Sequence, residues 1–288
     1  MKTALLLLFG SLLAVPAAAQ TKGENFHMDK EYPMNLSGTI KMNISDAKVT
    51  VTGSNRTTAR VKIDREVVVK GWFFGKQEFS VTIDNPDGNL DLREHYQSSY
   101  SGVVGYYNEK YTINLEVPLG ASLDINGDDG HYYIRNVNGA IELDVDDARI
   151  ELTGCKGEDF RFKLDDGRIA MDEGKGSLRI DGKDADVKIE HGNFTKVTAD
   201  LDDGDFVLET VLTDASDFNI KVEDGTADLR VLNGGGNFSL RHSDGHVHTF
   251  GNFQQTEKTD NSEKYTLNKG KANVFIRADD GKINLSAN

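Results

Sequence analysis

Aspartate residues recur at a nearly constant spacing through the second half of the chain, and they are the first candidates for chemistry. Seven of them lie 18 to 21 residues apart: Asp129, Asp147, Asp166, Asp184, Asp203, Asp224 and Asp244. If such residues stack along one edge of a fold, their carboxylates repel one another. Ca²⁺, which prefers oxygen ligands, would relieve that repulsion. The alternative is that each aspartate caps its own turn and that the edge is solvated.

The second interpretation is favoured, because the paired glycines of the calcium-binding nonapeptide repeat do not recur. Residues 234–236 are one isolated glycine run. We therefore expect no cofactor. The positions at which calcium would bind under the first interpretation are Asp129, Asp147, Asp166, Asp203 and Asp224.

Aromatic residues gather in two short segments that could recognise a ligand. The first segment holds Trp72, Phe73 and Phe74 between two glycines. The second holds four tyrosines among serines and glycines: Tyr96, Tyr100, Tyr106 and Tyr107. Tyrosine with serine and glycine combines rigid contact area with adaptable polar groups, and aromatic faces also stack on sugar rings. A second interpretation is equally open: the two segments fold back and cover the open end of a repeat stack.

Histidines and exposed charges are the remaining candidates. His246 and His248 alternate, so both project from one side of a strand, and His131 holds the equivalent position in an earlier repeat; no third metal ligand is evident. A polysaccharide-active enzyme would need carboxylates and bases on one face. An ordinary exposed sheet, in which opposite charges pair across neighbouring strands, also explains the outward charges and is favoured, because no specific catalytic constellation is evident. Those charges are Arg149, Arg161, Lys163, Arg168, Arg179, Asp181 and Lys188.

A repeat of apolar residues predicts how the aspartates are positioned. Before each aspartate, apolar residues occupy positions −6, −4 and −2, as in Ile141, Leu143 and Val145; after it they occupy +3 and +5, as in Ile150 and Leu152. Such alternation indicates strands with one buried face. The odd step from −2 to +3 would put the second set on the wrong face of a straight strand. The chain must therefore turn at each Asp-Gly or Asp-Ala pair.

A fixed period of this size is typical of a solenoid, in which each repeat forms one coil and the coils stack. Helix signals are nearly absent. We therefore predict an all-β fold: a right-handed parallel β-helix, or β-solenoid, with an N-terminal antiparallel β-meander. The predicted hand follows the usual crossover rule.

The rest of the chain divides around this repeat. Residues 1–19 have the pattern of a signal peptide, with Lys2 before an apolar run and small residues at the expected cleavage site, so we predict export. Residues 20–35 form an N-terminal extension. Residues 36–122 hold a first coil around Asp46, followed by four alternating strands that we interpret as the meander. The aromatic segments would be its first and third connections, at the same end.

Residues 123–288 hold the solenoid repeats, and 36–288 is expected to be one continuous domain. The 36 residues between Asp244 and Asp280 leave room for two coils, one of them degenerate. Residues 254–264 are polar and are predicted to be a loop that interrupts the last coils. The coil around Asp280 would then close the rod as a cap.

The run Val117–Ile125 (VPLGASLDI) leads directly into coils of the form Asp-Gly-x-apolar-x-apolar. This combination resembles a large bacterial family of exported β-strand-repeat proteins labelled "putative adhesin", a family of unknown function. The resemblance covers residues 40–285. It implies a parallel β-helix-like fold in the cell envelope or outside the cell, and it transfers no catalytic residue to this chain.

Composition limits the possible partners. The net charge of −14 argues against nucleic acid or an anionic membrane, which need a basic surface. Cys155 is the only cysteine, so no internal disulfide can form. No apolar run in the sequence is long enough to span a bilayer.

We expect a non-catalytic exported protein of the periplasm, cell surface or medium that binds or scaffolds, with a glycan or an envelope or surface protein as partner. The alternatives are a polysaccharide-active enzyme on the solenoid face and a purely structural envelope component. The oligomeric state is left open.

Overall fold

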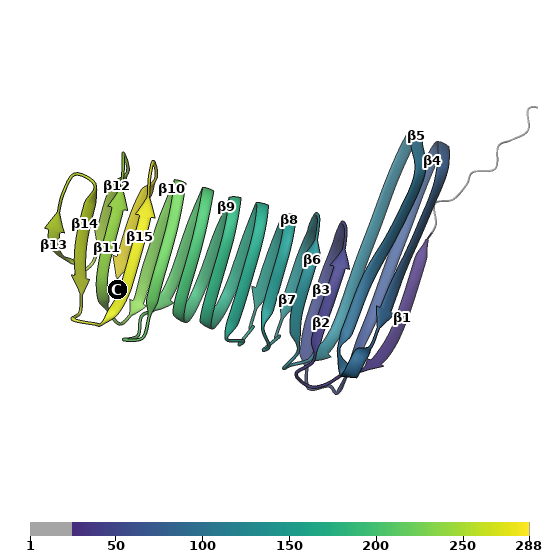
Figure 1. Ribbon diagram of the computed structural model, residues 1–288, viewed down its shortest axis with the longest axis horizontal. Coiled ribbons are helices and arrows are strands. Elements are labelled where there is room, and N and C mark those ends of the chain that lie inside the picture. Colours follow the sequence, from purple (N-terminus) through teal and green to yellow (C-terminus); the bar gives the residue numbers. More distant parts are fainter. Residues whose placement is uncertain (1–24, 288) are drawn as a thin grey trace, which may run out of the picture.

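The computed structural model describes residues 25–287, with their side chains except at 72–77 and 98–103. These residues form an all-β protein whose strands belong to one large, open, mixed sheet (Figure 1). Apart from a 3₁₀ turn at Pro86–Gly88, the described part of the chain has no helix, and none there is long and apolar enough to cross a membrane. The predicted signal peptide at 1–19 lies outside the described residues.

The centre of the molecule is a stack of coils, each made of a strand, a corner and a second strand (Figure 1). Successive coils pair in parallel: β2 with β6, β3 with β7, and β8 with β9. The strands of this stack are β2 (Thr39–Ile44), β3 (Ala47–Ser54), β6 (Ser122–Gly127), β7 (Gly130–Arg135), β8 (Ile141–Thr153), β9 (Asp159–Val211) and β10 (Asp217–Asn233). The solenoid-like stack is as expected from the repeat, and its right-handed winding stays a prediction.

Each coil contributes to two walls, and the core lies between them. We call the strands before the aspartate corners the first wall and the strands after them the second wall. Ile141, Leu143 and Val145 of the first wall, and Ile150 and Leu152 of the second, are at most 2% exposed. These are the positions that the repeat predicted to be buried. Full burial of one such side chain stabilises the fold by about 1.5–3 kcal/mol, so the apolar interior holds the stack together.

The corners use the chemistry expected of Asp-Gly. Gly167 and Gly225 have φ angles of +125° and +140°, a region that favours glycine. A Cβ on Gly225 would lie 2.0 Å from the carbonyl oxygen of Gly204 in the preceding coil. Glycine is therefore needed at this corner both for the turn and for the close approach of the coils.

A long hairpin stacks on the first coil at the N-terminal end. Its strands, β4 (Thr58–Asp84) and β5 (Leu90–Pro118), pair antiparallel along nearly their whole length and are joined by the predicted turn at residues 85–88. The prediction of four separate meander strands is wrong, because residues 71–75 lie inside β4 and the tyrosine-rich segment lies inside β5. The hairpin instead folds over midway (Figure 1), where Gly71 and Gly105 pair with φ angles of +129° and +138°.

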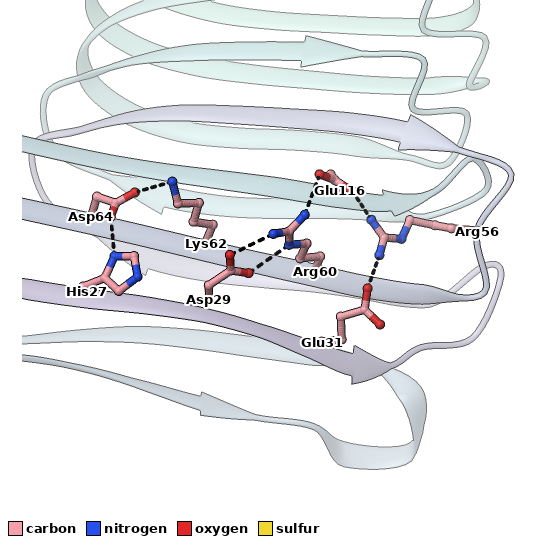
Figure 2. Close-up of polar contacts among 8 residues, drawn as sticks. All are labelled: His27, Asp29, Glu31, Arg56, Arg60, Lys62, Asp64 and Glu116. Atoms are coloured by element: carbon pink, nitrogen blue, oxygen red, sulfur yellow. Dashed lines mark hydrogen bonds and ion pairs between the residues drawn. The ribbon is translucent and has the colours of Figure 1, made fainter.

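A further strand, β1 (Phe26–Pro33), lies antiparallel to the first half of β4, within the region expected to be an extension. An ion-pair network binds it to the hairpin (Figure 2). Its members are His27, Asp29, Glu31, Arg56, Arg60, Lys62, Asp64 and Glu116. Arg60 donates two hydrogen bonds of 2.8 Å to Asp29, one to each carboxylate oxygen. This charged outer edge also protects the end of the sheet from pairing with other chains.

Acid should release β1 before it unfolds the coils. The hydrogen bond from Arg60 lowers the pKa of Asp29, and the contact with His27 lowers the pKa of Asp64. A carboxyl whose pKa is lower in the folded protein stabilises the fold above its ordinary pKa of about 3.9, and loses that contribution as the pH falls through the lower value. We expect the hydrogen-exchange protection of β1, corrected for intrinsic rates, to fall below about pH 4. In Arg60→Gln, β1 should already be less protected at pH 7 and should respond less to acid; an unchanged pH response would contradict this account.

The C-terminal end differs from the sequence prediction. The strands β11 (Gly236–His242) and β12 (His246–Phe250) form the coil around Asp244. The segment predicted to be a loop mostly forms a hairpin of β13 (Gln254–Lys258) and β14 (Ser262–Leu267), which pairs beside β11. This hairpin takes the place of the expected degenerate coil.

The coil around Asp280 is not a terminal cap. Its strands are β15 (Ala272–Ala278) and β16 (Lys282–Ala287). β15 lies between β10 and β11, and β16 lies between β10 and β12, with parallel pairing on both sides. The last coil in the sequence is therefore inserted between two earlier coils.

Removing the last coil should detach the coil that stacks on it. In a chain that ends at Leu267, β11 and β12 lose the strands that join them to β10, so we expect the amides of β11–β14 to lose hydrogen-exchange protection. The amides of β6–β9 should keep theirs, as they should in a control chain that ends at Asn233. Protection of β11–β14 in the chain ending at Leu267 would show that the inserted coil is dispensable.

Candidate binding site

The long hairpin projects beyond the corners of the coils. On the first wall, Arg93 of β5 pairs with Asn43; on the second wall, Thr112 pairs with Lys48. Between these two points β5 has many more residues than a coil uses for its corner, so this part of the strand extends beyond the coils. We call residues 65–81 of β4 and 94–111 of β5, which pair with each other, the overhang. It stands above the row of corners in Figure 1.

The overhang brings the two predicted aromatic segments together. Trp72 pairs with Val104, Phe73 with Val103 and Phe74 with Gly102. The side chains of Trp72, Phe73, Phe74 and Tyr100 lie outside those that the structure describes.

Several apolar and aromatic side chains of the overhang are exposed to solvent. Val104 is 67% exposed and Tyr106 is 53% exposed; Tyr96 and Tyr107 are also exposed. The Lys70 ammonium lies 5.8 Å from the centre of the Tyr106 ring. An exposed group of this kind is a suitable contact surface for a ligand.

A polar cluster supports the overhang from inside. Arg65 is 1% exposed, and its guanidinium lies 4.4 Å from the Phe79 ring centre and 5.9 Å from that of Tyr96. The Nε of Arg65 donates a 2.5 Å hydrogen bond to Glu109, to which the Tyr107 hydroxyl also donates at 2.5 Å. Burial raises the pKa of Tyr107, and the hydrogen bond to Glu109 adds to the effect. This cluster fixes β5, the strand that carries Val104 and Tyr106, against β4.

Glu94 connects the overhang to the first coil. It accepts hydrogen bonds from the hydroxyl of Ser45 at 2.6 Å and from its backbone N–H at 3.1 Å. Ser45 precedes Asp46 at the first corner, so this carboxylate caps that corner. Beside it, burial raises the pKa of Tyr111, and the charge of Glu94 raises it further.

Arg65, Glu94 and Glu109 were not among the site residues predicted from the sequence. A signal was available for Arg65, which follows Val61 and Ile63 in the alternating inward pattern and holds an inward position itself. A charged residue at such a position indicates a buried polar partner, because an unpaired buried charge is costly. The identity of that partner depends on the register between β4 and β5, which the sequence does not show.

The predicted aspartate row exists along the corners. Asp147 pairs in register with Asp166, and Asp203 with Asp224; these four and Asp129 are exposed. Partial desolvation and the neighbouring carboxylates raise the pKa values of Asp147 and Asp203. Among residues 25–287, no group of three or more His, Cys, Asp or Glu side chains is arranged to hold a metal ion.

The predicted histidines lie at the surface, and the outward charges of the first wall form ordinary surface pairs. His131 lies on β7, and His246 and His248 lie on β12; all three are exposed. Charges of the first wall pair between neighbouring coils: Lys163 with Asp144 at 2.9 Å and Lys183 with Asp165 at 2.6 Å. Cross-strand pairing of this kind is the alternative to an enzyme site that the sequence left open.

Removing the buried arginine should loosen the overhang without unfolding the rod. In Arg65→Ala, the overhang loses a buried side chain and its hydrogen bond to the Glu109 carboxylate, and a hydrogen bond to a charged group typically contributes about 1.5–3 kcal/mol. We expect hydrogen-exchange protection to fall in residues 65–81 and 94–111 and to stay unchanged in β6–β9. Lys70→Ala, which removes an exposed cation from the same strand, is the control and should change neither region. Equal loss of protection in both regions would show that Arg65 supports the whole fold.

Comparisons with known proteins place the chain in a family. The family model described as Toastrack DUF4097 matches residues 38–286. No curated protein matches the chain. Among solved structures, a "putative cell adhesion protein" from Clostridium sporogenes has 13% identity and a TM-score of 0.29, covering 92% of this chain and 100% of its own. A "putative adhesin" from Parabacteroides distasonis has 12% identity and a TM-score of 0.36, covering 91% of this chain and 97% of its own.

The family match includes the coils, the overhang and the inserted C-terminal coil. It confirms the family resemblance that the run at 117–125 and the aspartate repeat indicated. Because the family model matches most of this chain, the chain belongs to the Toastrack DUF4097 family.

Proposed function

We propose that this protein is an exported, non-catalytic binding protein of the bacterial cell envelope or surface, and that the overhang is its contact surface. The stack of coils would act as a rigid support. The observation that carries the proposal is the exposure of Val104 and Tyr106 on a part of the hairpin that extends beyond the coils.

The position of the overhang favours binding over capping. A cap would need to cover the apolar space between the two walls at the end of the stack. That space is bounded at the N-terminal end by the two end segments of β5, which pair with the first coil, and β4 pairs with β5 on their outer side. The overhang continues past the first corner, where there is no coil for it to cover.

A glycan is the ligand class that suits this surface best. Aromatic side chains with neighbouring serine and glycine supply stacking area together with hydrogen-bonding groups. The Arg65 cluster holds the strands in place, so little side-chain or loop freedom would be lost on binding. Export rests on the signal-peptide pattern of residues 1–19, and the periplasm, the surface and release into the medium are all compatible with the proposal.

Binding should depend on the exposed side chains of the overhang. The test measures binding of residues 20–288 to a panel of glycans and to envelope fractions. A Val104→Ser/Tyr106→Ala variant should keep its fold by circular dichroism and lose at least about 10-fold in affinity, which corresponds to about 1.4 kcal/mol. Phe250→Ala, which removes a 77% exposed aromatic at the other end of the rod, is the matched control and should bind normally.

Three results would contradict the proposal: no binding by the wild type, equal loss in the two variants, or chemical conversion of a glycan during the assay. The first favours a purely structural envelope component, and the third favours a polysaccharide-active enzyme.

A further inference from the structure

Four cationic or potentially cationic side chains form a row on the outer face of the second wall. Lys48 of β3 pairs in register with His131 of β7, His131 with Arg149 of β8, and Arg149 with Arg168 of β9. All four are exposed. We call Lys48, His131, Arg149 and Arg168 the cation ladder. It crosses successive coils near the N-terminal end of the rod.

The stacking of the coils does not require cations at this position. Like charges directly opposite each other on neighbouring strands destabilise a sheet, and the chain as a whole carries a net charge of −14. Later coils use the same position differently. Asp186 and Asp205 stand there, and each accepts a hydrogen bond from a backbone N–H of the next coil, at 3.3 Å and 3.0 Å. In those coils the side chain supports the stacking, whereas the four cations make no such bond.

Neighbouring groups compensate the ladder only in part. Arg168 pairs with Asp186 at 3.0 Å, and Arg149 lies 3.3 Å from Glu151 in its own coil. Pairs between exposed side chains of this kind are weak, commonly below about 1 kcal/mol, and leave the cations available to a ligand.

A groove runs beside the ladder, with a second charged row on its other side. Four corner aspartates, Asp46, Asp129, Asp147 and Asp166, each precede a ladder residue by two positions. The floor between the rows consists of small residues, Ala47, Gly130, Ala148 and Gly167, and the groove has a volume of about 640 Å³. Within the described part of the chain, no ion pair joins the two rows.

A neighbouring hollow extends the groove across the second wall. It has a volume of about 330 Å³ and lies over Ala170 and Val207, where small outward side chains replace longer ones. Arg149 and Arg168 stand on its border. A chain-like ligand placed on the ladder therefore has room to continue over neighbouring coils.

We propose that the cation ladder and its groove bind an extended glycan that carries carboxylate groups, with the glycan lying along the rod axis. Its carboxylates would accept hydrogen bonds from Arg149, Arg168 and Lys48, and its hydroxyls would donate to the aspartate row. Charge-assisted hydrogen bonds of both kinds are stronger than neutral ones. A nucleic acid also offers anionic phosphates to the ladder, but its backbone has few hydroxyl groups to donate to the aspartate row, so a glycan matches the two rows better.

The proposal rests on a surface other than the overhang and goes beyond the proposed function. The two can fail separately, because the overhang variant Val104→Ser/Tyr106→Ala leaves the ladder intact.

The test measures the dissociation constant of residues 20–288 for a de-esterified oligogalacturonate, with the fully methyl-esterified oligosaccharide of the same length as the neutral probe. The wild type should bind the acidic probe and not the neutral one. Arg149→Gln/Arg168→Gln should weaken binding by at least about 10-fold, because the loss of a single charge-assisted hydrogen bond to a ligand typically lowers affinity by about that factor. Binding should also weaken as salt is raised.

The control removes the same charge elsewhere. Arg161→Gln/Arg230→Gln alters two exposed arginines that also pair with neighbouring carboxylates, away from the ladder. It should bind the acidic probe normally, and so should the overhang variant. Circular dichroism and thermal melting establish that each variant is folded.

Four results would overturn the proposal: no binding of the acidic probe, equal binding of the neutral probe, equal weakening by the two arginine variants, or binding that requires added Ca²⁺. The last result would assign the aspartate row, and not the cation ladder, as the site.

Discussion

Parallel stacking of coils in register sets the geometry of this protein. Adjacent strands lie about 4.8 Å apart, so a side chain at one position of a coil lies beside the same position of the next. Rows of like residues are the result: apolar rows such as Ile150 and Ile169 in the interior, and aspartates at the corners. An unsuitable residue at one position disturbs its neighbours in two coils, which is why the glycine at a tight corner such as Gly225 is needed there.

Stacking also creates the two ends that the protein has to protect. An open sheet edge can pair with another chain, and natural proteins cover or charge such edges. At the N-terminal end, the long hairpin and then the charged strand β1 cover the first coil. At the C-terminal end, the β13–β14 hairpin extends the first wall, while the last coil is inserted one position further in. The end of the chain is thus held between two coils and is not left at an edge.

The overhang shows how a polar interior can be placed in such a fold. Beyond the first corner a charged group joins the apolar interior: Arg65 is buried, while Glu94 is half-buried and Glu109 lies at the border with solvent. Arg65 pairs with Glu109, as a buried charge requires, and Glu94 pairs with Ser45. The Arg65 cluster supports the exposed aromatic side chains of the overhang. On the second wall, the stacked coils hold the four side chains of the cation ladder in a row. The coils position the overhang and the cation ladder, while the exposed side chains of each surface supply its chemistry.

The coils could be predicted from the sequence alone, because burial on one face of a strand requires alternation and the odd step across Asp-Gly requires a corner. The sequence therefore predicted the buried residues, the aspartate row and the family. It did not determine which strands pair outside the repeat. The aromatic segment at 71–75 has the glycines of a turn, yet it continues a strand, because pairing with residues 102–105 of β5 supports the bend. The register of that hairpin, the partner of Arg65 and the insertion of the last coil became visible only in the folded molecule. Each depends on contacts between residues far apart in the chain, and local propensity and periodicity carry no information about such contacts.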